Sequence, residues 1–194
     1  MTLMTKLLRA SQSWRLDFAL AAGLVGLDVV ARLTPHVPNF TPLAASALFA
    51  GMMLRSRSLA LAVPILAMVL SDLVVGRDEW RTTMVIYAAL VLPAALGLWA
   101  RHFKIPVMAA ALVPASSLIF FLSTNFAVWA FSGMYAPTMD GLLRCYVAAL
   151  PFFQNTLAGD VFWSGVLFGG WWLARSALPA VKARSGQGPY VAAR

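Results

Sequence analysis

Carboxylates and basic side chains occur at unusual positions in this chain, because several lie within or beside long apolar runs. Asp28 and Arg32 follow "ALAAGLVGL", Asp72 ends the run "VPILAMVLS", and Asp160 precedes "VFWSGVLFGGWW". Ionisable groups within membrane segments are costly, so they usually face a protein interior or a water-filled cavity. These residue types can hold a small molecule through charged hydrogen bonds, which is the chemistry of a binding site.

Purely structural roles fit the same residue types. Asp28 with Arg32, and Asp140 with Arg144, are spaced four apart, so each pair can neutralise itself along one helix. Asp72 can also act only as the cap of a helix end. Asn125 and Asn155 can serve only as hydrogen-bonding links between helices. Asp160 has no partner nearby in the sequence, which favours a functional role for it.

No motif of a known reaction occurs in the chain. GxSxG, HExxH, GxGxxG and the Walker loop are absent, and no cluster of His and carboxylates has metal-ligand spacing. The single cysteine, Cys145, excludes an internal disulfide, a CxxC redox pair and a cysteine zinc cluster. We therefore expect no cofactor, and the chain cannot be an ATP-driven machine by itself.

The composition is that of an integral membrane protein. Of the 194 residues, 61% are hydrophobic and only 11% are charged, whereas a soluble domain carries about a quarter of its residues as charge. The formal charge of +8 does not indicate nucleic-acid binding, because the basic residues stand in ones and twos at the ends of apolar runs. The expected surroundings are a lipid bilayer.

Apolar runs predict an all-α membrane protein with about six transmembrane helices, one of them short. The predicted spans are 16–33, 42–54, 58–75, 82–100, 105–131 and 152–175. A further helix over 138–150, capped by Thr138 and ending before Pro151, is expected to lie at the membrane interface. The fifth span is long and is expected to be tilted or broken near Asn125. Residues 1–178 then form one domain, and residues 179–194 form a basic, disordered tail.

Six spans place both termini on one side of the membrane. Most of the 15 basic residues lie at the amino end, in the second-to-third and fourth-to-fifth connections, and in the tail. The positive-inside rule makes that side cytoplasmic.

With this topology the polar side chains gather near the outer surface, which predicts a cavity that opens outward. The connection "PHVPNFTP" lies on the same side and is expected to form a wall or lid, because prolines fix backbone shape. The candidate substrate-binding residues are Asp28, Arg32, Asn39, Phe40, Thr41, Asp72, Asn125, Trp129, Arg144, Tyr146, Asn155 and Asp160.

Three stretches together resemble an uncharacterised family of small bacterial inner-membrane proteins: "PNFTPLAASALFAG", "VPILAMVLSDLVVG" and the segment from "FFLSTNFAVW" to "GLLRCYVAALPFFQNTLAGD". That family is similar in size and layout to the S components of energy-coupling-factor (ECF) vitamin transporters. This resemblance implies an S-component-like helix bundle that captures a vitamin or similar micronutrient. It also implies an ATP-driven module as a possible partner, and Ala19–Gly23 has the small-residue spacing found where such a module docks.

Other functions remain open from the sequence. One is a membrane-embedded enzyme acting on a lipid or isoprenoid, with Asp72 and Asp160 as acid–base or metal groups. Another is a purely structural subunit, for which a polar cavity is unnecessary. A third follows from the S-component resemblance: a solitary cobalamin transporter with Cys145 as a cobalt ligand.

Overall fold

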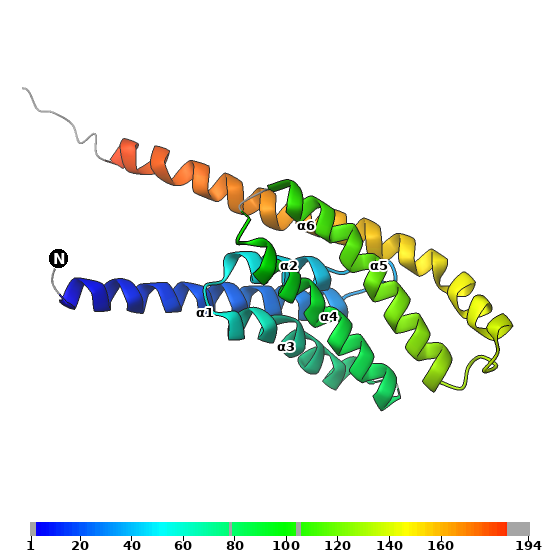
Figure 1. Cartoon of the computed structure of the whole chain (residues 1–194). Coiled ribbons are helices and arrows are strands. Elements are labelled where there is room, and N and C mark those ends of the chain that lie inside the picture. The colour runs from blue at the N-terminus through cyan, green and yellow to red at the C-terminus, as the bar shows by residue number, and fades with distance from the viewer. Residues whose placement is uncertain (1–2, 78, 104–105, 186–194) are drawn as a thin grey trace, which may run out of the picture.

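The computed structural model describes the backbone of residues 3–77, 79–103 and 106–185, and the side chains of residues 14–77, 79–103 and 111–176. The described residues form helices and connections without a strand, as the sequence predicts (Figure 1). The helices are α1 (Leu3–Leu33), α2 (Leu43–Met53), α3 (Arg57–Val75), α4 (Trp80–Ala100), α5 (Pro106–Phe131) and α6 (Met139–Ser185).

The short helix α2 lies at the centre of the bundle and packs against all the other helices. Its residues are apolar or small around the whole circumference, which is the pattern of a helix surrounded by protein. Its approach to α4 is especially close: a Cβ atom on Gly51 would overlap the backbone carbonyl of Ala94. A Cβ atom on Gly97 of α4 would likewise overlap the carbonyl of Leu48. These two glycines therefore set the distance between α2 and α4.

Three helices in the described part of the chain are long and apolar enough to cross a membrane. They are α3, α4 and the Ala111–Phe131 part of α5, and they indicate a membrane protein. About six spans were predicted from the sequence, and the other three predicted spans do not meet this description. α2 is apolar but has only 11 residues, α1 carries several charges between positions 16 and 33, and polar residues interrupt the apolar composition of α6.

The predicted interfacial helix and the sixth span form one continuous helix, so their separation at Pro151 was wrong. α6 runs through 47 residues from Met139 to Ser185 and includes part of the expected disordered tail. Proline lacks one backbone donor, yet membrane helices accommodate it where neighbouring groups compensate; α3, α4 and α5 also contain internal prolines. Thr138 does accept a hydrogen bond from Gly141 N (3.1 Å), as an N-cap residue does.

α5 continues through the polar residues where a break was expected. The side chains of Ser123, Thr124 and Asn125 each donate to the carbonyl four residues earlier, at 2.8 Å. Polar side chains satisfied in this way leave the helical backbone bonds in place.

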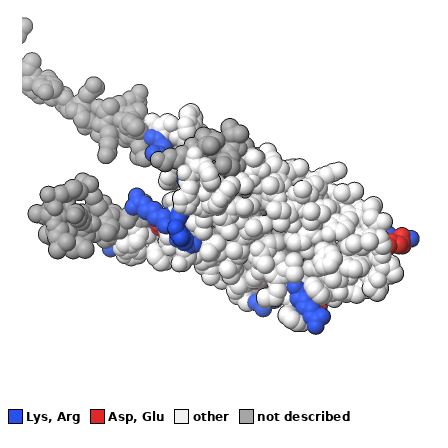
Figure 2. Space-filling model, viewed as in Figure 1, with Lys and Arg blue, Asp and Glu red and all other residues white. Residues whose placement is uncertain are grey.

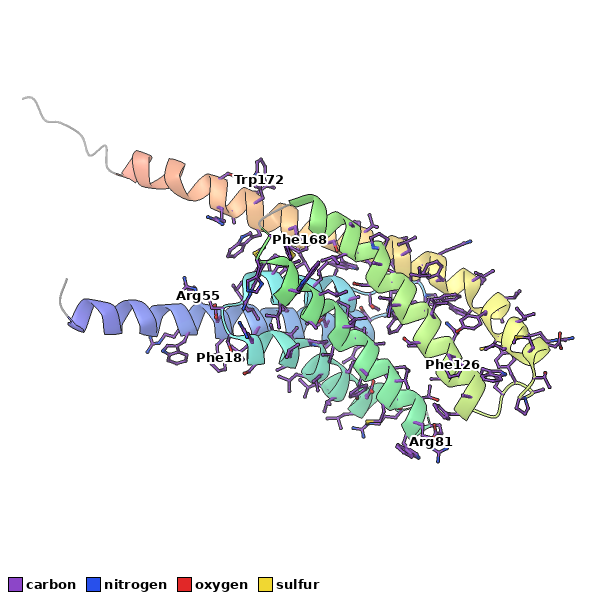
Figure 3. All side chains as sticks on the ribbon, viewed as in Figure 1. Phe18, Arg55, Arg81, Phe126, Phe168 and Trp172 are labelled. Atoms are coloured by element: carbon purple, nitrogen blue, oxygen red, sulfur yellow. The ribbon has the colours of Figure 1, made fainter. Side chains whose placement is uncertain are left out.

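The two ends of the bundle differ in composition. The first turns of α1 and the last turns of α6 lie at one end, whereas the α3–α4 and α5–α6 connections lie at the other (Figure 1). Arg55 and Arg81 mark these opposite ends in Figure 3. On the face drawn in Figure 2, charged side chains gather toward the ends and the middle carries none. An uncharged middle band between charged ends is what a membrane protein presents to lipid.

An apolar core fills the end of the bundle near Arg55. Buried side chains of α1, α2 and α3 form it, and Phe168 and Trp171 of α6 pack against it. Within this core the ring centroid of Phe49 lies 5.1 Å from that of Phe168 and 6.1 Å from that of Trp171. In the same region Asp17 of α1 accepts hydrogen bonds from the backbone N–H groups of Arg55 and Ser56, at 3.0 and 3.2 Å. This end is therefore closed by packed side chains.

Candidate functional site

A cavity of about 480 Å3 lies toward the other end of the bundle, and all six helices or their connections contribute to its wall. This volume lies within the range of small-molecule pockets. Its lining residues are Arg32, His36, Asn39, Thr41, Leu43, Ala44, Met68, Asp72, Val75, Gly76, Arg77, Thr83, Ile86, Tyr87, Leu90, Phe120, Thr156 and Asp160.

Asp72 holds the wall formed by α1, α3 and α4 together. One of its carboxylate oxygens accepts from Arg32 Nη2 at 2.9 Å, and the other accepts from the Tyr87 hydroxyl at 2.8 Å. The side chains of Arg32 and Asp72 are 17% and 5% exposed, so this ion pair is largely removed from solvent. Arg32 also donates to the thioether sulfur of Met68. Asp72 is thus more than a helix cap, because it links Arg32 of α1 and Tyr87 of α4 to α3.

The expected pair between Asp28 and Arg32 does not form, because Arg32 is directed to Asp72 on the neighbouring helix. Asp28 is instead fully buried between α1 and α2, where Ser46 Oγ donates to its Oδ2 at 2.5 Å. Its Oδ1 has no hydrogen-bond partner. Asp28 lies behind the cavity wall and is not a lining residue.

Asp160 places a carboxylate on the wall formed by α5 and α6. It is 4% exposed and accepts a hydrogen bond from Ser117 Oγ at 2.6 Å. Among the described residues no basic side chain lies within ion-pairing distance of it, in contrast to Asp72. Asp160 therefore has no basic partner among the described residues, just as it has none nearby in the sequence.

The proline-rich connection between α1 and α2 forms part of the wall, as predicted. Its turn is closed by a hydrogen bond from Phe40 N to Val37 O at 3.0 Å. Asn39 adopts the left-handed conformation there (φ 64°), which asparagine tolerates better than most residues. The turn rests on α6: a Cβ atom on Gly159 would approach Phe40 Cα to 3.1 Å. The Phe40 ring packs on Phe162, with centroids 5.6 Å apart, and is not a lining residue.

Several predicted binding residues lie outside the cavity wall. Arg144 pairs with Asp140 at 2.7 Å on the surface, where both side chains are about three-quarters exposed (74% and 73%). Trp129 Nε1 donates to the carbonyl of Ala136 in the α5–α6 connection at 3.0 Å. Asn155 is half-buried on α6 and does not line the cavity.

The structure also separates Cys145 and its neighbours from the cavity. Cys145 is 2% exposed between α6 and α5, and its thiol donates to the carbonyl of Asn125 at 3.4 Å. The Tyr146 hydroxyl donates to Leu122 O at 2.7 Å, and Asn125 bonds within its own helix. These residues connect α5 to α6 rather than line the cavity.

Sequence reasoning missed several lining residues. Tyr87 lies in the apolar run "MVIYAALVL", where its hydroxyl is the only polar side-chain group and is the signal that could have identified it. Arg77 follows Gly76, a residue with positive φ (93°) that turns the chain after α3. His36 belongs to the proline-rich connection, which was expected to form a wall, but it was not among the candidate binding residues.

The cavity lining combines two carboxylates, basic groups and apolar side chains. Within the described residues there is no group of three or more His, Cys, Asp or Glu able to hold a metal ion. Asp72 already accepts from two partners, and Asp160 is bonded to a serine. Arg77 and His36 add basic groups to the lining of the cavity.

The comparison with protein-family models confirms the uncharacterised family predicted from the sequence. A family model matches residues 12–181 and therefore covers most of the chain. The chain belongs to a family of unknown function (DUF6580). No curated protein and no solved structure matches it.

Proposed function

We propose that this protein is a membrane component that captures a small water-soluble molecule, such as a vitamin or similar micronutrient, for uptake. The observation that carries the proposal is the polar cavity at one end of the bundle, opposite the packed apolar core at the other. A cavity with this layout can take up a solute from one side of the membrane and block its passage to the other. Release then requires a rearrangement of the helices, driven by the protein itself or by a partner such as an ECF-type ATP-driven module.

Arg77, at the cavity wall, favours a ligand that carries an anionic group. Asp72 neutralises Arg32, but within the described residues no carboxylate lies within ion-pairing distance of Arg77. Arg77 and His36 lie at the same cavity, and a guanidinium is well suited to bind carboxylate or phosphate. The apolar walls, with Leu43, Leu90 and Phe120, would cover the remainder of the ligand.

The proposal includes an orientation in the membrane. The cavity end faces outward, both termini are cytoplasmic, and all six helices lie in the bilayer of the bacterial inner membrane, with α2 enclosed by the others. Single cysteines at Thr34 and Met134 should then react with a membrane-impermeant thiol reagent in intact spheroplasts, whereas one at Ser56 should not. If Ser56→Cys is labelled and the other two are not, the protein has the opposite orientation.

Identification of the molecule that co-purifies tests the function. The purified protein is denatured and the released molecules are identified by mass spectrometry, in parallel for Arg77→Gln and Arg81→Gln. Both arginines are exposed, but only Arg77 lines the cavity, so Arg81→Gln is the matched control. A charge-assisted hydrogen bond is worth about 1.5–3 kcal/mol, so Arg77→Gln should lower ligand affinity by about tenfold or more.

The results separate the competing functions. A stoichiometric water-soluble anion that is lost in Arg77→Gln and kept in Arg81→Gln supports capture. A bound lipid or isoprenoid supports the enzyme, because Asp72 and Asp160 line the same cavity. A protein that purifies without any ligand, and binds none from a metabolite extract, contradicts the proposed function.

A further inference from the structure

Two carboxyl groups, Asp28 of α1 and Asp160 of α6, are buried in the bundle without a basic partner. They are 0% and 4% exposed. Among the described residues, no Lys, Arg or His side chain lies within ion-pairing distance of either one. A buried carboxylate is costly unless a partner compensates its charge or a proton neutralises it. Each of the two carboxyls therefore needs another form of compensation.

The helices around Asp28 offer one nearby cation, and that cation is already paired. In the described part of the chain, α1 packs against α2 and α3. α2 contains no ionisable residue, and α3 contains only Arg57, at its first position, and Asp72. Arg32, one turn further along α1, pairs with Asp72 at 2.9 Å. One guanidinium thus serves two carboxyls, and the group is neutral only when Asp28 carries a proton.

The surroundings of Asp160 offer no free cation within reach either. α6 packs against α2 and α5, and neither of these helices contains an ionisable residue. Along α6 the nearest ionisable residues are Tyr146 and Arg175, both several turns away. The other ionisable groups that line the cavity are Arg32, His36, Asp72, Arg77 and Tyr87. Arg32 is paired with Asp72, and neither Arg77 nor His36 lies within ion-pairing distance of Asp160.

The contacts of Asp28 are complete only when its carboxyl carries a hydrogen. Ser46 Oγ lies 2.5 Å from Asp28 Oδ2 and 3.2 Å from the carbonyl oxygen of Leu43. A serine has one hydrogen to donate, so beside an ionised carboxylate only one of these contacts is a hydrogen bond. A protonated carboxyl donates to the serine, and the serine then donates to the carbonyl. The unpartnered Oδ1 of Asp28 then belongs to a neutral group and shares no charge.

The same arrangement recurs at Asp160. Ser117 Oγ lies 2.6 Å from Asp160 Oδ2 and 3.0 Å from the carbonyl oxygen of Val113, one turn earlier on α5. A proton on Asp160 again makes both contacts hydrogen bonds, in the order carboxyl, serine, carbonyl. Two carboxyls on different helices thus share the same surroundings, with a serine as the only polar partner and no cation in reach.

We propose that Asp28 and Asp160 are proton-binding groups, which take a proton from water and are uncharged in the folded protein at mildly acidic pH. Ionisable side chains inside membrane bundles commonly form proton relays in pumps and transporters. The link to capture rests on the proposed function. Asp160 lines the cavity, so its neutral form removes a charge that repels an anionic molecule. Proton and anion would then favour each other's binding, and the proton gradient would drive their joint uptake.

Infrared spectroscopy of the full chain tests the proton sites without a substrate, so its failure is distinct from failure of the proposed function. In a detergent without ester groups, the C=O stretch of a protonated carboxyl is separate from the bands of ionised carboxylates. About two pH units above the ordinary aspartate value of about 3.9, exposed and paired carboxyls are ionised. We expect the protonated band in the parent, about half of it in Asp28→Asn and in Asp160→Asn, and none in the double variant.

The matched control is Asp17→Asn. Asp17 is also buried, at 8% exposure, but its carboxylate accepts hydrogen bonds from two backbone N–H groups, at 3.0 and 3.2 Å. This variant should keep the whole band. A parent without the band, or a band that the double variant keeps, would overturn the proposal. A band that one single variant leaves unchanged overturns it for that residue.

The pH dependence of stability gives a second measurement, which decides the matter if the double variant does not fold. The folded parent holds two protons that the unfolded chain releases above about pH 4, so its stability falls as pH rises until the two groups ionise. The unfolding equilibrium constant should rise by up to about tenfold per pH unit for each proton. Each single variant should lose one such contribution. A parent whose stability does not fall between about pH 5 and 7 contradicts the proposal.

Discussion

Replacing Asp72 by asparagine should destabilise the protein strongly, because it removes the charge that pairs with Arg32 inside the bundle. The substitution conserves side-chain size, so its effect reports on charge and hydrogen bonding rather than on packing. Removing one partner of a buried ion pair costs about 3–5 kcal/mol. Arg32 retains 17% exposure and faces the cavity, so water can partly solvate it. The lower end of that range, about 3 kcal/mol, is therefore expected.

The chain contains a matched control in Asp140→Asn. Asp140 and Arg144 are joined at 2.7 Å, which is no longer than the 2.9 Å of the buried pair, but both side chains are mostly exposed. Solvent-exposed pairs of this kind contribute roughly 0–1 kcal/mol, so Asp140→Asn should change stability by less than about 1 kcal/mol. The two substitutions thus differ in burial and share their chemistry.

The assay is denaturant-induced unfolding of the detergent-solubilised protein, with the midpoint and slope measured for each variant. A third variant, Arg32→Met/Asp72→Leu, removes both charges and should recover at least half of the loss, because apolar pairs often replace buried ion pairs without cost. The reasoning is refuted if Asp72→Asn and Asp140→Asn unfold alike. It is also refuted if the double variant is no more stable than Asp72→Asn.

Three further predictions follow from backbone and packing geometry. Gly51→Ala should cost at least about 2 kcal/mol and lower the folded yield, because its Cβ would overlap the α4 backbone; Gly165→Ala, with open space around it, should not. Cys145 should resist a maleimide in the folded protein and react fully after denaturation, since it is 2% exposed. Asn39→Ala should lose about 1 kcal/mol through its positive φ, and Asn39→Gly should lose less in the same unfolding assay.

The positions of the helices could be predicted from the sequence because apolar runs mark them. Where a helix ends or breaks depends on tertiary contacts, which the sequence does not show. The prolines illustrate this: Pro151 predicted a helix end, yet α6 continues through it. Proline removes one backbone bond, and whether that ends a helix depends on the packing around it. The polar residues of α5 near Asn125 also suggested a break. Their side chains instead form hydrogen bonds to carbonyls of the same helix.

The sequence placed Asp72, near the end of α3, and Asp160, within α6, among the candidates, and both line the cavity. Its hydrogen bonds were not predictable, because they join residues distant in sequence. Arg32 is four residues from Asp28 but pairs with Asp72, since a partner on another helix competes with a weak i,i+4 contact. Tyr87 was missed because its signal, a single hydroxyl within an apolar run, does not show which residue on another helix it contacts.

Native mass spectrometry of the purified protein tests the central claim most directly. Ala44 lines the cavity, so Ala44→Phe should fill part of it, whereas Ala130→Phe changes an exposed position of α5 outside the cavity. The predicted result is a one-to-one complex with a water-soluble molecule in the parent and in Ala130→Phe, and loss of that complex in Ala44→Phe at unchanged unfolding midpoint. A complex that persists in Ala44→Phe, or no complex in any of the three proteins, would contradict a ligand-binding cavity.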